Sequence, residues 1–366
     1  MLPTLEISIK QKQLRRLDLQ AEFKLNGDYK IIKEEYIDLI PSCFTLGASD
    51  EGRDVAKEVE VEFDYLFPEV MLTLLHDVYV SRSGGVRIGK TKFISETIEA
   101  GIDVNFDVPL SAYEPIDTCT AASKFGNFNH AIFTMESLPL MLLSQMDLQA
   151  AQAPRPLHFE RDYCGEAFVT EHLRLIAALG LFGDHFDRDV HAARAFVPTA
   201  SRRDGSFRAT ALSQAVAAKI RSVVATPEGG VLPRRIYISR RYASSRVPRH
   251  IDALEWIAAA RGYTPVHLEQ MTALDQVALF ASCEAIMAEH GAGLANLQYA
   301  SPGCRVLELF PSAMYGKWVF RLAAHCAGAV YSTGSFPVED GWVYNRDDVD
   351  IDPYLFNHCL DHLDGI

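Results

Sequence analysis

Residues 284–310 read EAIMAEHGAGLANLQYASPGCRVLELF, and this stretch decides the fold class. The apolar run at 284–289 predicts a buried strand that opens into a glycine-rich turn. Residues 294–299 predict a short helix, ended by the Ser-Pro-Gly at 301–303, and the run at 304–310 predicts a second strand. A strand that reaches the next strand through a short helix is typical of a parallel sheet covered by helices.

The segments on both sides continue this alternation. Apolar and β-branched runs predict strands at 235–239, 264–269 and 329–334. Helical spacing of apolar residues predicts helices at 251–262, 272–283, 315–328 and 354–363. Thr272 is expected to cap its helix together with Asp275, three positions later. The C-terminal half is therefore predicted to be Rossmann-like.

The N-terminal half is less regular but also mixes both patterns. Strands are expected at 58–63, 156–160 and in a hairpin over 75–89, and helices at 130–147 and 166–180. The first 50 residues carry no pattern that places them. The polar stretch at 197–210 lacks an apolar period and predicts a domain boundary. We expect an α/β fold with an N-terminal domain at 1–198 and a C-terminal domain at 199–366.

Bulk composition narrows the function classes. The 366 residues suffice for one large or two ordinary domains, and 48% of them are hydrophobic, as in globular proteins. The net charge of −13 argues against nucleic acid as the main partner, because proteins that grip its backbone carry a basic surface. A local basic pocket for a small phosphorylated ligand stays compatible with this charge.

The spacing of the cysteines and the N-terminal segment predict that the protein is located inside the cell. The seven cysteines are widely spaced and form no CxxC, which favours reduced, buried thiols over a zinc site or disulfides. The N-terminal segment has no apolar core of a signal peptide, and no run of about 18 apolar residues occurs. We expect a soluble, cytoplasmic protein, with association at the inner face of the membrane left open.

The turn EHGAGL is the first candidate site. Glycines let a ligand approach the backbone, and the N-terminus of the following helix presents free N–H groups to an anion. His290, Gly291, Ala292, Gly293, Leu294 and Asn296 are the candidates here. The turn lacks the full GxGxxG spacing, which disfavours a nicotinamide-dependent dehydrogenase. The alternative is a plain tight turn with a buried histidine.

Two further features of the C-terminal half could join this turn. Arg240, Arg241 and Arg246 follow the strand at 235–239 and could bind phosphate oxygens, although a solvated basic loop would read the same way. Glu308 lies within an apolar run, where a carboxylate needs a partner. It could bind ribose hydroxyls or form a salt bridge with Arg305 or Arg321.

In the N-terminal half, GNFNHAIFTMESLP at 126–139 places His130 and Glu136 near the start of a helix. A histidine that titrates near neutral pH suits a general base, and a carboxylate can serve likewise or orient it. The alternative is a capped helix with a polar first turn. The acidic strings at 187–189 and 348–350 could hold Mg²⁺ or Mn²⁺, but their polar context favours solvated loops.

Taken together, these motifs resemble glycosyltransferase family 61. The resemblance is densest over 234–335, where YISRRYASSR and the segment at 275–310 match the family's motifs, and GNFNH matches its N-terminal motif. It implies an inverting transfer on a GT-B-like pair of Rossmann-like domains facing a cleft. Arg240 and Arg246 would contact the diphosphate, Glu308 the ribose, and His130 and Glu136 the acceptor.

The resemblance also implies the partners. It points to a nucleoside diphosphate sugar, with a UDP-sugar favoured, as donor, to a glycan or glycolipid acceptor, and to no required metal or other cofactor. A bacterial-type enzyme of capsular or other cell-surface polysaccharide synthesis would fit. Arg249 and His250 stand where the family often has an Asn-Glu pair. This departure keeps open a non-catalytic nucleotide- or glycan-binding component of a polysaccharide assembly complex.

Overall fold

A computed structural model of the chain describes the side chains of residues 75–82, 86–87, 109–121, 129–139, 171–172, 188–197, 216–218, 220–221, 224, 232–314, 319–344 and 346–365, and the backbone of further strands. The chain forms two compact units. One unit comprises Met1–Glu35 and Leu66–Val216, and the other comprises Tyr36–Tyr65 and Ala217–Ile366.

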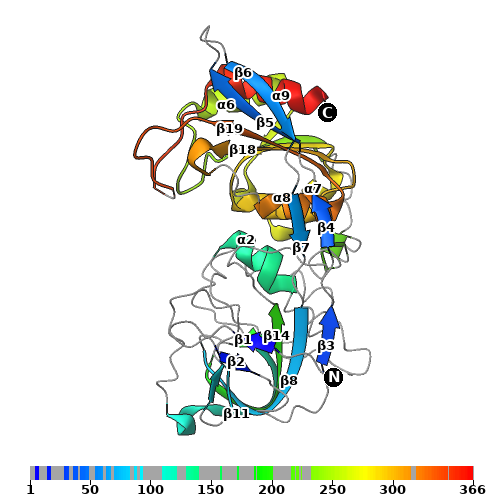
Figure 1. The fold of residues 1–366 in the computed structure, drawn as a ribbon, viewed down its shortest axis with the longest axis vertical. Coiled ribbons are helices and arrows are strands. Elements are labelled where there is room, and N and C mark those ends of the chain that lie inside the picture. The colour runs from blue at the N-terminus through cyan, green and yellow to red at the C-terminus, as the bar shows by residue number, and fades with distance from the viewer. Residues whose placement is uncertain are drawn as a thin grey trace. The chain divides into compact units, whose positions relative to one another are not determined.

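The second unit is built on a sheet of seven strands in the order β16-β15-β17-β18-β19-β5-β6 (Figure 1). These strands are β5 (Ser42–Ala48), β6 (Asp54–Glu60), β15 (Arg235–Ile238), β16 (Thr264–Val266), β17 (Ala285–Glu289), β18 (Arg305–Pro311) and β19 (Val330–Phe336). Neighbours from β16 to β5 pair in parallel, and β6 at the edge is antiparallel. The parallel sheet predicted over 235–336 is confirmed, and β5 and β6 add a segment that the sequence pattern left unplaced or assigned to the other domain.

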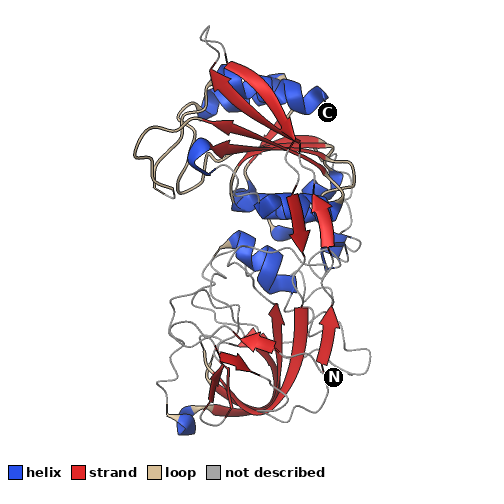
Figure 2. Cartoon of the chain, viewed as in Figure 1, coloured by secondary structure: helices blue, strands red, loops and turns tan. Residues whose placement is uncertain are grey.

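Helices cover both faces of this sheet (Figure 2). They are α6 (Ile251–Ala260), α7 (Ala273–Ser282), α8 (Val319–Ala327) and α9 (Pro353–Gly365), with the 3₁₀ helices Leu268–Gln270, Ala292–Tyr299 and Ser312–Met314. As predicted, Thr272 caps α7 by accepting a hydrogen bond from the Asp275 N–H at 3.1 Å. Gly262 follows α6 at φ +78°, a conformation that suits glycine at the end of a helix.

Successive side chains along a strand point to opposite faces of the sheet. One set of strand residues therefore packs against α6 and α9, and the other set against α7 and α8. Met287 and Leu309 pack with Leu254 of α6 and Phe356 of α9 in one buried cluster. Residues one position away therefore face α7 and α8. Figure 1 shows α6 and α9 on one side of the sheet and α7 and α8 on the other. Because both faces are covered, the central strands β17 and β18 are apolar along most of their length, whereas β19 also buries Ser332, Thr333 and Ser335.

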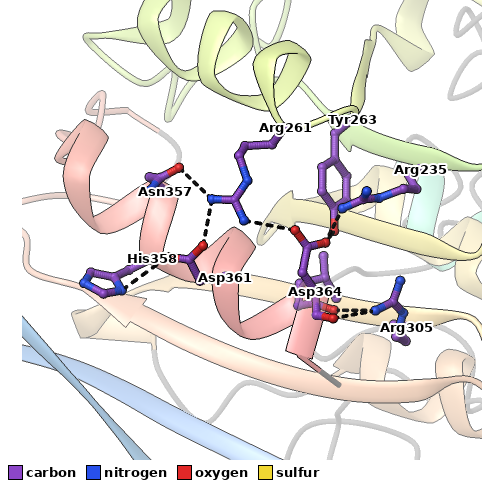
Figure 3. A network of polar contacts seen from close by, with 9 residues as sticks. Arg235, Arg261, Tyr263, Arg305, Asn357, His358, Asp361 and Asp364 are labelled. Atoms are coloured by element: carbon purple, nitrogen blue, oxygen red, sulfur yellow. Dashed lines mark hydrogen bonds and ion pairs between the residues drawn. The ribbon is translucent and has the colours of Figure 1, made fainter.

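The end of α9 is fastened at the amino edge of the sheet (Figure 3). Asp364 pairs with Arg235 at the start of β15 and accepts hydrogen bonds from Arg261 Nη2 at 3.0 Å and Tyr263 Oη at 2.8 Å. Arg305 Nη1 donates to the Leu363 carbonyl at 2.9 Å, which places a cation at the C-terminus of the helix. This edge is thus occupied by a structural network, which leaves the opposite edge for a ligand.

The first unit contains a mixed sheet in the order β10-β9-β8-β14-β11-β12-β13, with β3 also paired to β8. Its strands are β3 (Tyr29–Ile32), β8 (Val70–Val80), β9 (Val86–Ile88), β10 (Thr91–Phe93), β11 (Glu114–Ala121), β12 (Leu157–His158), β13 (His185–Phe186) and β14 (Val190–Ala200). The pairs of β11, β12, β13 and β14 are parallel, and β3, β8, β9 and β10 are joined by antiparallel pairs. In the same unit, β1 (Leu5–Ile7) and β2 (Arg15–Leu17) form a small antiparallel sheet. Another small sheet is formed by β4 (Tyr36–Leu39) with β7 (Phe63–Leu66), from the segment 36–65 that belongs, up to Tyr65, to the second unit.

This sheet confirms an α/β class but corrects one local prediction. Residues 197–200, expected in a linker, continue β14 and pair with β8 up to the register Ala200↔Val70. These residues, Val197, Pro198, Thr199 and Ala200, belong to the strand because backbone pairing with β8, and not an apolar period, places them there. The GT-B arrangement and the boundary at 198 stay predictions. Among the described residues, no helix is long and apolar enough to span a membrane.

Candidate functional site

The candidate residues of the second unit meet at the carboxyl edge of its sheet. β15 and β17 are parallel neighbours with Ile238 opposite Ala288, so the loops that follow them leave the sheet side by side. Arg240 and Arg246 lie in the first loop, and His290 and Gly291 in the second. This is the edge at which open parallel sheets bind ligands.

Arg246 is the cation at the centre of this edge. It is only 7% exposed, and its Nη1 donates to the His290 carbonyl at 2.7 Å. The guanidinium lies over the Tyr344 ring, 4.5 Å from the centroid. Burial, together with the charge of Arg240, lowers the pKa of Arg246 to about 10, so the side chain stays charged at neutral pH. Its φ of 56° is uncommon for a residue with a side chain and indicates a loop held by its surroundings.

Arg240 is fixed against the same loop. Its Nη2 donates to the Ser245 carbonyl at 2.7 Å, and its Nε donates to the Arg246 carbonyl at 3.2 Å. Burial lowers its pKa, an effect that Glu289 and Glu269 oppose. A Cβ atom at Gly291 would overlap Nη1 of Arg240, so the glycine is required for this close approach. The loop thereby holds a half-buried guanidinium group, that of Arg240, and a buried one, that of Arg246.

His290 is held by a buried carboxylate. Its Nδ1 lies 2.5 Å from Oε1 of Glu308, and Tyr331 Oη donates to the other oxygen of Glu308. The imidazole stacks on Phe310 with 4.8 Å between ring centroids, and Glu308 is fully buried. A histidine whose Nδ1 donates to a carboxylate keeps its ring orientation and presents Nε2 for other contacts.

These contacts bear on one part of the alternative interpretation of Glu308, the salt bridge to Arg305. The salt bridge between Glu308 and Arg305, one of the alternatives from the sequence, does not form. Arg305 instead donates to the carbonyl groups of Leu363 and Asp364 at the opposite edge of the sheet. The carboxylate orients His290 instead. Its expected contact with a ribose hydroxyl stays a prediction.

Arg241 follows Arg240 in sequence, but its side chain pairs with different residues. Its Nη2 is 2.5 Å from Asp252 Oδ1 and 2.7 Å from Glu255 Oε2, both on α6. Although burial raises the pKa of Glu255, hydrogen bonds from Arg241, Ser239 and His267 lower it to about 2. The structure thus brings Arg240 and Arg246 together, while it places Arg241 against the helix.

The turn after β17 continues into a 3₁₀ helix, Ala292–Tyr299. Leu294 is buried, and its N–H donates to the Gly291 carbonyl at 3.0 Å. Asn296 is fully buried, and its Nδ2 donates to Gln276 Oε1 on α7 at 2.7 Å. Its Oδ1 has no hydrogen-bond partner within the described part of the chain. Ala292 and Gly293 are half-buried at the start of the turn.

The structure adds two residues that the sequence reasoning did not select. Glu289, the last residue of β17, is 5% exposed and accepts a hydrogen bond from Tyr237 Oη at 2.6 Å. Tyr344 covers the guanidinium of Arg246. Glu289 could have been selected from the sequence, because it is a carboxylate that ends an apolar run directly before His290. Nothing in the sequence pattern connects Tyr344 with Arg246, because the two residues are distant along the chain and meet only in the fold.

The loops that carry Arg246 and Tyr344 are joined by backbone contacts. Pro248 and Val349 form an isolated bridge, and the Val247 N–H donates to Asp348 Oδ1 at 3.0 Å. Arg249 lines a cavity of about 430 Å³ beside this bridge, together with residues 337–342 and 346–350. The acidic string at 348–350 therefore has a structural role in this junction. Within the described ranges, no group of three or more His, Cys, Asp or Glu residues could hold a metal ion.

His130 and Glu136 lie in the first unit, on one continuous helical segment. Asn129 caps it by accepting hydrogen bonds from the Ala131 and Ile132 N–H groups, at 2.9 and 3.3 Å. The segment begins as α2 (His130–Ile132) and continues as a π-helical turn, Phe133–Ser137. The wider turn precedes Pro139, whose ring nitrogen cannot donate to a carbonyl of the preceding turn. π-Helical turns occur frequently at functional sites.

The surroundings of these two residues differ from those of an exposed first turn. His130 is half-buried, with its ring 5.6 Å from that of His172, and Glu136 is 9% exposed. A buried carboxylate and a half-buried imidazole are the groups whose protonation a protein can tune. Their roles toward an acceptor stay predictions.

Comparison with protein families gives one match. The profile of the family described as Glycosyltransferase 61 matches residues 75–307, which is more than half of the chain. The chain belongs to glycosyltransferase family 61. A comparison with curated proteins gives no match.

Family membership indicates glycosyltransferase activity, with a sugar donor and an acceptor as substrates. The matched region of this family 61 protein contains His130, Glu136, the arginine loop and the turn at 290–296. Glu308 lies one position beyond its end. The match thus spans candidate residues in both units, and the structure assembles those of the second unit at one sheet edge.

Proposed function

We propose that the protein transfers a sugar, with inversion, from a nucleoside diphosphate sugar to a hydroxyl group of a glycan. The observation that supports the donor site most directly is the half-buried guanidinium group of Arg240 and the buried one of Arg246 beside His290. Two like charges held together away from water favour an anionic ligand between or beside them. A diphosphate supplies such an anion, and the family supplies the sugar chemistry.

The reaction is a single displacement at the anomeric carbon. The acceptor oxygen forms a bond to that carbon while the bond from carbon to the phosphate oxygen breaks. The acceptor proton passes to a base, and the bonding electron pair leaves with the nucleoside diphosphate. Arg240 and Arg246 would stabilise the charge that grows on this leaving group.

We propose His130 as the base and Glu136 as the residue that orients it or replaces it. The buried position of Glu136 and the half-buried position of His130 support this assignment. A UDP-sugar donor, a glycan or glycolipid acceptor of cell-surface polysaccharide synthesis, and a cytoplasmic location at the inner face of the membrane complete the proposal. The donor and acceptor rest on the family resemblance of the motifs, and the location rests on the spacing of the cysteines and on the N-terminal segment.

A thermal-shift screen against nucleotide sugars tests the donor. A ligand that binds only the folded state raises the unfolding midpoint, and we expect UDP and UDP-sugars to do so more than the corresponding purine nucleotides. Release of UDP from the donor that binds best then separates an enzyme from a pure binding protein. Stable binding without any release of UDP, with or without candidate glycan acceptors, would favour the non-catalytic alternative.

Transfer is expected to survive removal of divalent cations. If Arg240 and Arg246 neutralise the diphosphate, a metal ion has no charge left to offset there. The measurement is sugar transfer after dialysis against EDTA, compared with an aliquot to which Mn²⁺ has been returned. Complete loss of transfer with recovery on adding Mn²⁺ would contradict a metal-independent site.

A further inference from the structure

Glu289 presents a buried carboxylate oxygen at the candidate donor site. Its Oε1 accepts the hydrogen bond from Tyr237 Oη at 2.6 Å. Its Oε2 is also buried and accepts no hydrogen bond from any residue that the structure describes. A carboxylate oxygen left without a donor is costly inside a protein, which makes such an atom a candidate ligand contact.

The surroundings of Glu289 point to the kind of ligand. Burial raises the pKa of this carboxyl group, while the hydrogen bond from Tyr237 and the charges of Arg240 and Arg246 lower it. Arg246 donates to the carbonyl of His290, the residue that follows Glu289, which places this cation next to the end of β17. The buried Nε of Arg246 also lacks an acceptor among the described residues. One unsatisfied acceptor, at the end of β17, and one unsatisfied cationic donor, in the loop after the neighbouring β15, thus occur at the same edge of the sheet. A ligand that carries a hydroxyl close to a phosphate satisfies both.

Glu308, the other buried carboxylate of this edge, is differently engaged. Its two oxygens bind His290 and Tyr331 within the protein. Glu289 keeps one oxygen uncommitted and ends its strand at the ligand-binding edge. Of the two carboxylates, Glu289 has the better geometry for a hydroxyl group that comes from outside the chain.

We propose that Glu289 is a specificity-determining residue whose Oε2 accepts a hydrogen bond from a hydroxyl group of the nucleotide-sugar donor. This inference rests on the proposed function. The hydroxyl belongs either to the ribose or to the transferred sugar, both of which flank the diphosphate. Glu289 thereby selects a ligand with a hydroxyl at that position, while Arg240 and Arg246 bind the phosphates.

The test compares ligands as well as variants. Calorimetric titration measures the dissociation constants of UDP, 2′-deoxy-UDP, 3′-deoxy-UDP, UDP-glucose and UDP-N-acetylglucosamine with the native protein, Glu289→Met and Glu289→Gln. Methionine has a similar volume and no carboxylate oxygen. Glu284→Met is the matched control, because Glu284 lies at the other end of the same strand, where it is exposed and pairs with Arg234.

A ribose contact predicts that the native protein and Glu284→Met bind UDP about 10- to 100-fold more tightly than one of the deoxy analogues, whereas Glu289→Met binds them about equally. A sugar contact predicts instead that Glu289→Met loses the native preference for a UDP-sugar over UDP. Ratios between ligands cancel any effect of the lost charge on the phosphates, and the analogues probe the native protein even if a variant fails to fold.

Two outcomes overturn the inference about Glu289, and a third overturns the proposed function on which it rests. If the native protein binds UDP but every ligand ratio is the same in Glu289→Met, Glu289→Gln and the native protein, Glu289 does not read a hydroxyl group. Equal affinity of the native protein for UDP, both deoxy analogues and both UDP-sugars excludes such a contact without any variant. If the native protein binds none of the five ligands, the proposed function itself fails.

Discussion

Replacing His130 with alanine is expected to lower kcat for sugar transfer by about 10²- to 10⁴-fold, the usual contribution of a general base. The loss should appear at saturating donor, because His130 lies in the first unit and the proposed phosphate contacts lie in the second. UDP affinity should change little. Glu136→Gln should lower kcat less if Glu136 orients the base, and by as much if Glu136 is itself the base.

His191→Ala provides the control in the same unit. His191 lies on β14, where its Nε2 is 2.6 Å from Asp77 Oδ1 and its ring stacks on Tyr79. Its removal perturbs a surface contact of the sheet and should leave kcat close to the native value. Near-native turnover by His130→Ala would show that another group removes the proton from the acceptor.

Replacing Arg246 with alanine is expected to weaken UDP binding by about 30- to 1,000-fold, the equivalent of about 2–4 kcal/mol for loss of a buried charged partner. Arg246 carries both its own charge and the hydrogen bond to the His290 carbonyl. Arg240→Ala should act in the same direction, since its guanidinium fixes the carbonyl groups of Ser245 and Arg246. Calorimetric titration with UDP measures each effect.

Alanine variants of two other arginines are the controls. They show whether weaker UDP binding comes from loss of a specific phosphate contact or from loss of positive charge in general. Arg234 is exposed and pairs with Glu284 before the strands begin, so Arg234→Ala should bind UDP like the native protein. Arg241 is held by Asp252 and Glu255, and Arg241→Ala should affect UDP binding less than Arg246→Ala does. Unchanged UDP affinity in both Arg240→Ala and Arg246→Ala would exclude the proposed phosphate site.

Much of the second unit can be predicted from local sequence. The apolar runs and helical periods between 235 and 336 appear as β15 to β19 with α6, α7 and α8 between them. Burial on both sheet faces makes the central strands β17 and β18 apolar along most of their length, which is why short runs suffice to recognise them. Thr272 and Asp275 likewise act within one helical turn.

The same reasoning could not place β5 and β6. These strands come from residues 42–60, yet they join the sheet beside β19, with Thr333 opposite Cys43. No local pattern states which sheet a strand enters, because pairing depends on backbone groups that every residue carries. The first unit shows the same limit at residues 197–200, which were expected in a linker and extend β14.

For the candidate site, the sequence by itself determined the residue types and the loops that carry them. The arginines after β15, the glycine-rich turn after β17 and the matched family all follow from residues read in order. Only the tertiary structure decided the partners. Arg246 reaches the His290 carbonyl across 44 positions, Glu308 meets His290 across 18, and Arg241 lies against α6. Hydrogen bonds depend on distance and direction in space, so adjacent arginines with equal charge acquire different partners once the strands and helices are packed.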